Sequence, residues 1–298
     1  MNTLSRRSAL GLLGSGMAAT ALAPASALAA NEGLRLSLAA YSFRDYFKFM
    51  KGKERTAKAP ATDMFKFIDF CAENGCAGAE LTSYFFPPDA DAKYFRRLRR
   101  HADKKGVAVS GTAVGNNFSL EPGPERDEQA AYVRTWIDNA VILGAPHIRI
   151  FAGKKKKGTS EERADELVID ALKDICRYAG RHKIKLGLEN HDSIATAERL
   201  IRLLKAVDSE WLGVNLDSGN FRTVDPYLDF EQSAPYAVNV QMKTKLKIGD
   251  ETVAADLPRF ISLLKKGKYR GWVALEYEEK DNPYEACPSV LQELKRLL

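Results

Sequence analysis

Three carboxylates close short apolar runs in the second half of the chain, at positions where acid and base chemistry is possible. They are Glu189, Asp217 and Glu276, and each follows a mostly aliphatic run. A carboxylate inside a protein costs several kcal/mol of stability unless it is paired, hydrogen-bonded or bound to a metal. Three of them at the same depth would repel one another, so the pattern predicts a cation among them.

A divalent metal is the cation that this donor set favours. Gln241 closes another apolar run and offers an amide oxygen beside the three carboxylates. Oxygen ligands without a thiolate suit Mn²⁺ or Mg²⁺ better than structural zinc. The alternative is a pocket without metal, in which Arg149, Lys243 and His191 pair with the carboxylates. The predicted metal ligands are Glu189, Asp217, Gln241 and Glu276.

Eight short apolar runs, each followed by an amphipathic stretch, are the elements that would position these side chains. This alternation predicts parallel strands joined by crossover helices. Eight units in about 260 residues, with no G-x-G-x-x-G motif after the first strand, favour a single-domain (β/α)8 TIM barrel of the α/β class over an open doubly wound sheet. All strand ends then meet at one mouth. The expected strands are 36–41, 78–82, 107–112, 147–151, 185–189, 213–217, 238–242 and 273–276.

Amphipathic stretches fill the gaps between these strands. Thr62 and Ser160 stand where helix N-caps are expected, and Gly75, Gly106 and Gly144 stand where helices should end. The expected helices are 63–74, 92–105, 125–143, 161–182, 195–207, 227–233, 257–266 and 284–298.

The first thirty residues read as a twin-arginine export signal. Arg6 and Arg7 precede an uncharged stretch at 11–22 and an Ala-rich segment that ends at residue 30. The apolar run is shorter than the roughly 20 residues that a membrane-spanning helix needs. We therefore expect removal of 1–30, a barrel over 31–298, a periplasmic or secreted location, and no stable membrane anchoring.

Charge and cysteine content exclude two other classes of protein. The formal net charge is +6, and its densest run, 154–157, follows an expected strand and reads as a solvated loop, so we expect no nucleic-acid binding. The cysteines form no CxxC pair and have no His at zinc-like spacing, which argues against a zinc module and favours free, buried thiols. They are Cys71, Cys76, Cys176 and Cys287.

Four segments together resemble the xylose-isomerase-like sugar phosphate isomerase/epimerase family. They are 188–191 (LENH), 211–221 (WLGVNLDSGNF), 240–243 (VQMK) and 273–277 (VALEY), and the similarity covers essentially the whole mature chain in order and spacing. The resemblance implies that Glu189 and Glu276 are both metal ligands and an acid/base pair. Two positions depart from the family's usual pattern: Gln241 and Asn220 stand where many such epimerases have His.

The chemistry that the resemblance implies is proton transfer next to a carbonyl. A metal that chelates a substrate carbonyl and hydroxyl stabilises an enediolate, and two glutamates remove and return the proton. A metal-dependent sugar isomerase or epimerase is therefore the first expectation, with a small-molecule sugar as substrate and a monomer or homodimer as the assembly. The alternatives are a periplasmic lyase or hydratase acting on 3-keto-glycosides and a non-catalytic sugar-binding barrel. A repair endonuclease is disfavoured, because that branch needs a zinc site rich in His.

Nine further residues are candidates around this centre. His191 is expected either to shuttle a proton or bind a hydroxyl, or to hydrogen-bond a residue that binds the metal. Lys243 is expected either to stabilise an oxyanion or to form a salt bridge with the carboxylates. Arg149 would hold an anionic group or brace Glu189, and Glu80 would bind a sugar or tie the barrel floor together. The remaining candidates for substrate binding are Tyr41 and Asn220, with Phe43, Phe85 and Phe86 as apolar walls or as packing.

Overall fold

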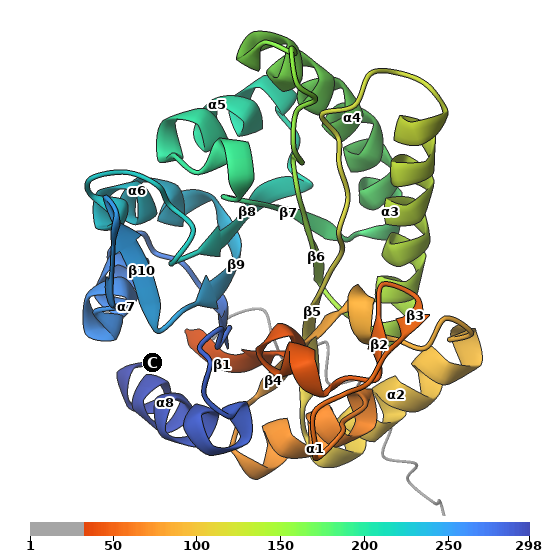
Figure 1. The fold of residues 1–298 in the computed structure, drawn as a ribbon, viewed down its shortest axis with the longest axis vertical. Helices are drawn as coiled ribbons and strands as arrows, with labels where there is room; N and C mark the ends of the chain where they lie inside the picture. Colours follow the sequence, from red (N-terminus) through yellow and green to blue (C-terminus); the bar gives the residue numbers. More distant parts are fainter. Residues whose placement is uncertain (1–32) are drawn as a thin grey trace, which may run out of the picture.

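A computed structural model describes residues 33–298, in which the apolar runs pair side by side and close into a barrel (Figure 1). Every pairing in the ring is parallel, and the first strand lies between the second and the last. The predicted (β/α)8 fold is confirmed. In ring order the strands are β1 (Leu34–Ala39), β4 (Gly78–Thr82), β5 (Ala108–Ala113), β6 (His147–Ile150), β7 (Lys185–Glu189), β8 (Leu212–Asp217), β9 (Ala237–Met242) and β12 (Gly271–Leu275).

A helix follows each strand and lies outside the ring (Figure 1). The helices bury one face against the strands, as α5 does with Leu200, Leu203 and Leu204. This packing turns the strand ends toward a single mouth. The helices are α1 (Met64–Glu73), α2 (Ala92–Lys105), α3 (Pro124–Leu143), α4 (Glu161–His182), α5 (Ala197–Val207), α6 (Pro226–Ser233), α7 (Leu257–Lys266) and α8 (Pro283–Leu297).

The helix ends follow the expected chemistry with one correction. Ser160 accepts a hydrogen bond from the backbone of Arg163 and caps α4, and Gly106 and Gly144 adopt left-handed conformations at the ends of α2 and α3. The prediction that Thr62 caps α1 is wrong. Asp63 holds that position, because its carboxylate accepts from the two free backbone amides of Phe65 and Lys66.

Two short hairpins are additions that the alternation did not predict. The strands β2 (Phe49–Met50) and β3 (Lys53–Glu54) form one after β1. The strands β10 (Lys245–Ile248) and β11 (Glu251–Ala254) form the other, directly after β9. Only two residues separate the second hairpin from the end of the barrel strand β9, so it lies beside the mouth (Figure 1).

The four cysteines are all buried and unbonded, as expected. Within residues 33–298 no helix is long and apolar enough to cross a membrane. The predicted twin-arginine signal and its boundary at residue 30 lie outside the described residues.

Candidate functional site

The predicted acidic residues converge at the carboxyl ends of the strands. Glu189 and Asp217 are the last residues of β7 and β8, and Glu276 directly follows β12. All three are buried, with exposed fractions of 3%, 0% and 4%. Asp217 pairs in register with Gln241 of β9, so four neighbouring segments of the ring bring polar side chains to one end of the barrel.

Glu189 has a cation of its own. The Nε of Arg149 on β6 lies 3.0 Å from its Oε2, and the Asn220 amide donates to its Oε1 at 2.9 Å. Burial raises the pKa of Glu189, and the Arg149 guanidinium opposes that shift. Arg149 is held in turn, because its Nη1 donates to the carbonyl of Val114. Arg149 therefore braces Glu189, which is one of the two roles expected for it.

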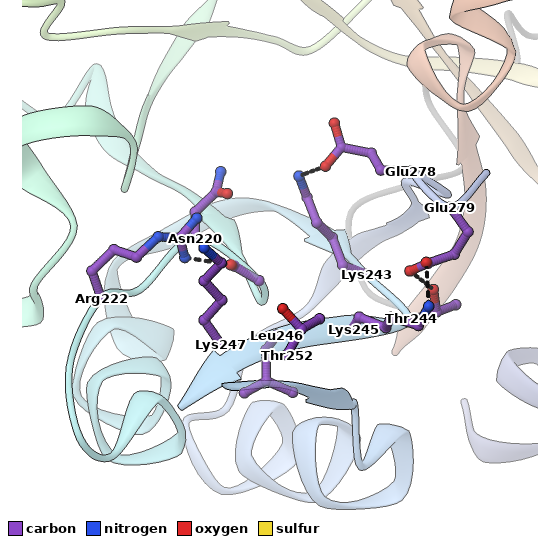
Figure 2. A pocket seen from close by; sticks show the side chains of 11 residues that line it. Asn220, Arg222, Lys243, Thr244, Lys245, Leu246, Lys247, Thr252, Glu278 and Glu279 are labelled. Atoms are coloured by element: carbon purple, nitrogen blue, oxygen red, sulfur yellow. Dashed lines mark hydrogen bonds and ion pairs between the residues drawn. The ribbon is translucent and has the colours of Figure 1, made fainter. Parts of the chain in front are cut away.

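Lys243 is the second cation at the mouth. Its Nζ lies 3.3 Å from Asp217 Oδ2 and 3.6 Å from Glu276 Oε2, and it also contacts Glu278 (Figure 2). Although burial opposes protonation, these three carboxylates raise the pKa of Lys243 well above its ordinary value. The expected salt bridge to the carboxylates is present. Glu278, which the sequence did not single out as a site residue, is part of the same cluster.

Asp217 is fixed in position by its backbone neighbours. The Asn190 side chain donates to the Asp217 carbonyl and accepts from the Asp217 amide, both at 2.8 Å. Asp217 Oδ1 accepts from the backbone of Gly219, whereas Oδ2 has no hydrogen-bond partner and faces Lys243. Burial raises the pKa of Asp217 to about 7 and that of Glu276 well above its usual range, with Lys243 opposing both shifts. Asn190 is a positioning residue that the sequence motif contained but did not identify.

Gln241 points into a buried polar network below the carboxylates. Its Oε1 accepts from Asn215 and its Nε2 donates to Glu80 Oε1, both at 2.6 Å. Asn239 donates to the other oxygen of Glu80 and to the side-chain oxygen of Asn215. Burial raises the pKa of Glu80 to about 7. Glu80 is 0% exposed and both its oxygens are engaged, an arrangement that favours the structural tie over a contact with sugar.

These residues fit the expected four-ligand metal site poorly. Both polar atoms of the Gln241 amide are already bonded, and the free oxygen of Asp217 faces the ammonium of Lys243. Within residues 33–298, no three His, Cys, Asp or Glu side chains are grouped closely enough to hold an ion. The Mn²⁺ or Mg²⁺ site stays a prediction from the sequence.

Two other candidates lie at the edge of the cluster. His191 turns to Asp192, with Nδ1 3.0 Å from its Oδ2, and its ring packs against Phe151. Tyr41 lies in the 3-10 helix after β1 (Ala40–Tyr46), half-buried against Tyr84 and Phe85. Its pKa is raised by burial and, to a smaller extent, by the carboxylates of Glu278 and Glu276. Phe43, Phe85 and Phe86 are buried in the core, where they serve packing.

A cavity of about 240 Å³ opens between the mouth and the β10–β11 hairpin, and Lys243, Asn220 and Glu278 are the members of the cluster that line it. Figure 2 shows Lys243 on one side of it, Arg222 and Asn220 on another, and Lys247 and Thr252 from the hairpin below. Arg222 is anchored by hydrogen bonds to the carbonyls of Gly219 and Phe221. A ligand in this cavity would contact Lys243 directly.

Comparison with known proteins places this chain in a family. Residues 68–296 match the family model described as xylose isomerase-like TIM barrel. No curated protein matches the chain significantly.

Solved structures of low sequence identity share the fold. An L-ribulose 3-epimerase superposes with a TM-score of 0.69 at 13% identity, covering 88% of this chain and 92% of its own. The IolI protein with a bound zinc atom gives 0.68 at 15% identity, with 88% and 96% covered. The 3-keto-D-glucoside 4-epimerase YcjR from E. coli gives 0.66 at 15% identity, with 88% and 99% covered. At these identities the likeness establishes the fold alone.

Proposed function

Because this chain belongs to the xylose isomerase-like TIM barrel family, we propose that it is a sugar isomerase or epimerase that moves a proton next to a substrate carbonyl. The observation that carries the proposal is a pair of buried glutamates, Glu189 and Glu276, on β7 and after β12, each beside a different cation. The epimerases among the structural neighbours, which act on L-ribulose and on 3-keto-D-glucosides by their names, support a sugar as the substrate class.

The charges assign different roles to the two glutamates. Glu189 is the carboxylate paired directly with the Arg149 guanidinium, which favours its anionic form and so suits a base. Glu276 shares one ammonium with Asp217 and Glu278, so one proton among these three carboxylates is favoured. Two carboxyl groups held in different charge states by their surroundings are the usual arrangement for acid and base work.

Proton transfer in the proposed step begins at Glu189. Glu189 removes the proton from the carbon beside the carbonyl, the C–H electrons form a carbon–carbon double bond, and the carbonyl electrons move to its oxygen. Lys243, at the wall of the cavity, would donate a hydrogen bond to that oxyanion. A proton returned by Glu276 to the opposite face inverts the centre. Delivery to the former carbonyl carbon, with transfer of the neighbouring hydroxyl proton to the oxyanion, exchanges the ketone and the alcohol.

A lyase acting on 3-keto-glycosides is the second candidate, and the cavity beside the mouth favours it. A glycoside needs room for its aglycone, and the space between Lys243 and the hairpin residue Lys247 supplies about 240 Å³. The carbanion formed by Glu189 would then expel the aglycone from the adjacent carbon as an alcohol, with a proton from Glu276. One active site is compatible with both outcomes, which differ only in the substrate's leaving group.

The products of turnover test the proposal. Purified protein is incubated with free ketoses and with 3-keto-glycosides, in H₂O and in D₂O, and the products are separated and weighed by mass spectrometry. Isobaric products that gain one deuterium in D₂O are the expected result. Release of an aglycone, or a change in mass in H₂O, supports elimination or hydration instead. If a sugar binds but no substrate takes up deuterium from D₂O, both the isomerase and the lyase proposals are contradicted. The remaining function would then be that of a sugar-binding barrel.

We also propose that the enzyme is exported through the twin-arginine pathway to the periplasm or beyond. The basis is the sequence alone: Arg6 and Arg7 ahead of the uncharged stretch at 11–22. Replacing both with Lys keeps the charge and is expected to abolish export of the full chain from the cytoplasm. Fractionation followed by immunoblotting measures it, with the single Arg35→Lys variant, outside the signal, as the control. Unchanged export of the double variant would contradict the proposal.

A further inference from the structure

The ammonium of Lys243 lies among three carboxylates. Its Nζ lies 3.3 Å from Asp217 Oδ2 and 3.6 Å from Glu276 Oε2, and it also contacts Glu278. The lysine side chain is only 12% exposed. The Lys243 ammonium is therefore shared by carboxylates from two parts of the barrel. One part is the end of β8 and the other is the segment after β12.

A divalent ion would compete with this ammonium for the same oxygen. An ion bound to Asp217 Oδ2 would lie about 2.1 Å from it. Lys243 Nζ lies 3.3 Å from that oxygen, so the two positive centres would be less than about 5.5 Å apart in a buried site. Repulsion at that distance is weakly screened. Ion and ammonium are therefore alternative occupants.

The expected fourth ligand is also engaged elsewhere. Gln241 is 1% exposed and bridges Asn215 and Glu80 through hydrogen bonds of 2.6 Å. Turning its oxygen toward an ion would break both bonds and leave Glu80 with one amide partner fewer. A buried polar group without its partner is destabilising, so the network opposes this rotation. Glu189 is likewise already paired with Arg149.

We propose that the Lys243 ammonium replaces the divalent metal in this chain, as the built-in cation that pairs with Asp217 and Glu276 and faces the substrate oxygen. The ion pairing follows from the contacts alone, whereas contact with a substrate oxygen rests on the proposed function. The enzyme would then work without a metal. The arrangement also gives a reason for Gln at 241, because a neutral amide completes the network around Glu80 without adding a ligand.

Manganese binding tests the proposal without any assay of turnover. Metal-stripped protein is titrated with Mn²⁺ by calorimetry and by electron paramagnetic resonance, as wild type, Lys243→Met and Lys243→Arg. The wild type and Lys243→Arg are expected to bind no more tightly than about 1 mM. Lys243→Met, which keeps the side-chain length and removes the charge, is expected to bind at least about tenfold more tightly. Adding Asp217→Asn to it should abolish the gain.

Two results would overturn the proposal. One is stoichiometric binding of Mn²⁺ to the wild type that Asp217→Asn abolishes, and the other is no gain of affinity in a folded Lys243→Met. If Lys243→Met does not fold, the wild-type titration still decides. Once a substrate is found, turnover that survives chelation supports the proposal and loss of turnover restored by Mn²⁺ opposes it. Absence of any substrate would count against the proposed function and leave the binding result standing.

Discussion

Replacing either glutamate with glutamine is expected to lower turnover at least about 10²-fold, because each variant removes one proton-transfer group. In Glu189→Gln the amide oxygen can still accept from Arg149, and in Glu276→Gln the shape of the buried side chain is kept. The fold should therefore persist. The measurement is the initial rate with the best substrate of the product screen, alongside thermal unfolding of each variant.

The two variants should also differ from each other. If Glu189 is the base, Glu189→Gln loses deuterium exchange into the substrate. If Glu276 only returns the proton, Glu276→Gln still allows the first C–H bond to break and retains part of that exchange. Glu285→Gln, on the exposed start of α8, is the matched control and should keep full activity. Full activity in Glu189→Gln or Glu276→Gln would remove the two-glutamate mechanism.

The barrel itself was predictable because its signal is carried by local pattern. Each buried strand is a short apolar run, and β4 and β7 begin and end at the predicted residues. The hairpin of β10 and β11 escaped prediction for the opposite reason. Its residues are mostly exposed and polar, as in Lys245 and Lys247, so no apolar face marks it as sheet. The sequence pattern therefore did not predict the hairpin that forms one wall of the cavity.

The candidate site was predictable as a set of strand ends but not as a set of contacts. Because Asp217 and Gln241 end consecutive predicted strands, they were expected to lie side by side, and they do pair in register. It could not tell that the Gln241 amide turns down to Glu80, because that choice depends on Asn215 and Asn239 on neighbouring strands. Whether Lys243 faces solvent or folds back over the carboxylates likewise depends on where the charged groups lie in space. The spacing of residues along the sequence does not give that arrangement.

Arg149 is the residue whose loss is expected to cost the most stability. It is 3% exposed and lies 3.0 Å from Glu189, which is equally buried. Arg149→Met would leave the Glu189 charge inside the barrel without its cation and the Val114 carbonyl without its guanidinium donor. Breaking a buried pair from one side destabilises a protein by about 3–5 kcal/mol. In a chain of this size that corresponds to a fall of about 10 °C in the unfolding midpoint.

A double variant separates the effect of the unpaired Glu189 charge from the effect of the packing lost with the Arg149 side chain. Arg149→Met combined with Glu189→Gln removes both charges, so it should recover most of the stability that Arg149→Met loses. Arg163→Met, which removes an exposed ion pair with Glu121, should leave the midpoint unchanged. Unfolding by heat and by urea measures these three variants and the single Glu189→Gln. If the double variant is as unstable as the two single losses added together, Arg149 acts mainly through packing, and the view of Glu189 as a buried anion held by a guanidinium fails.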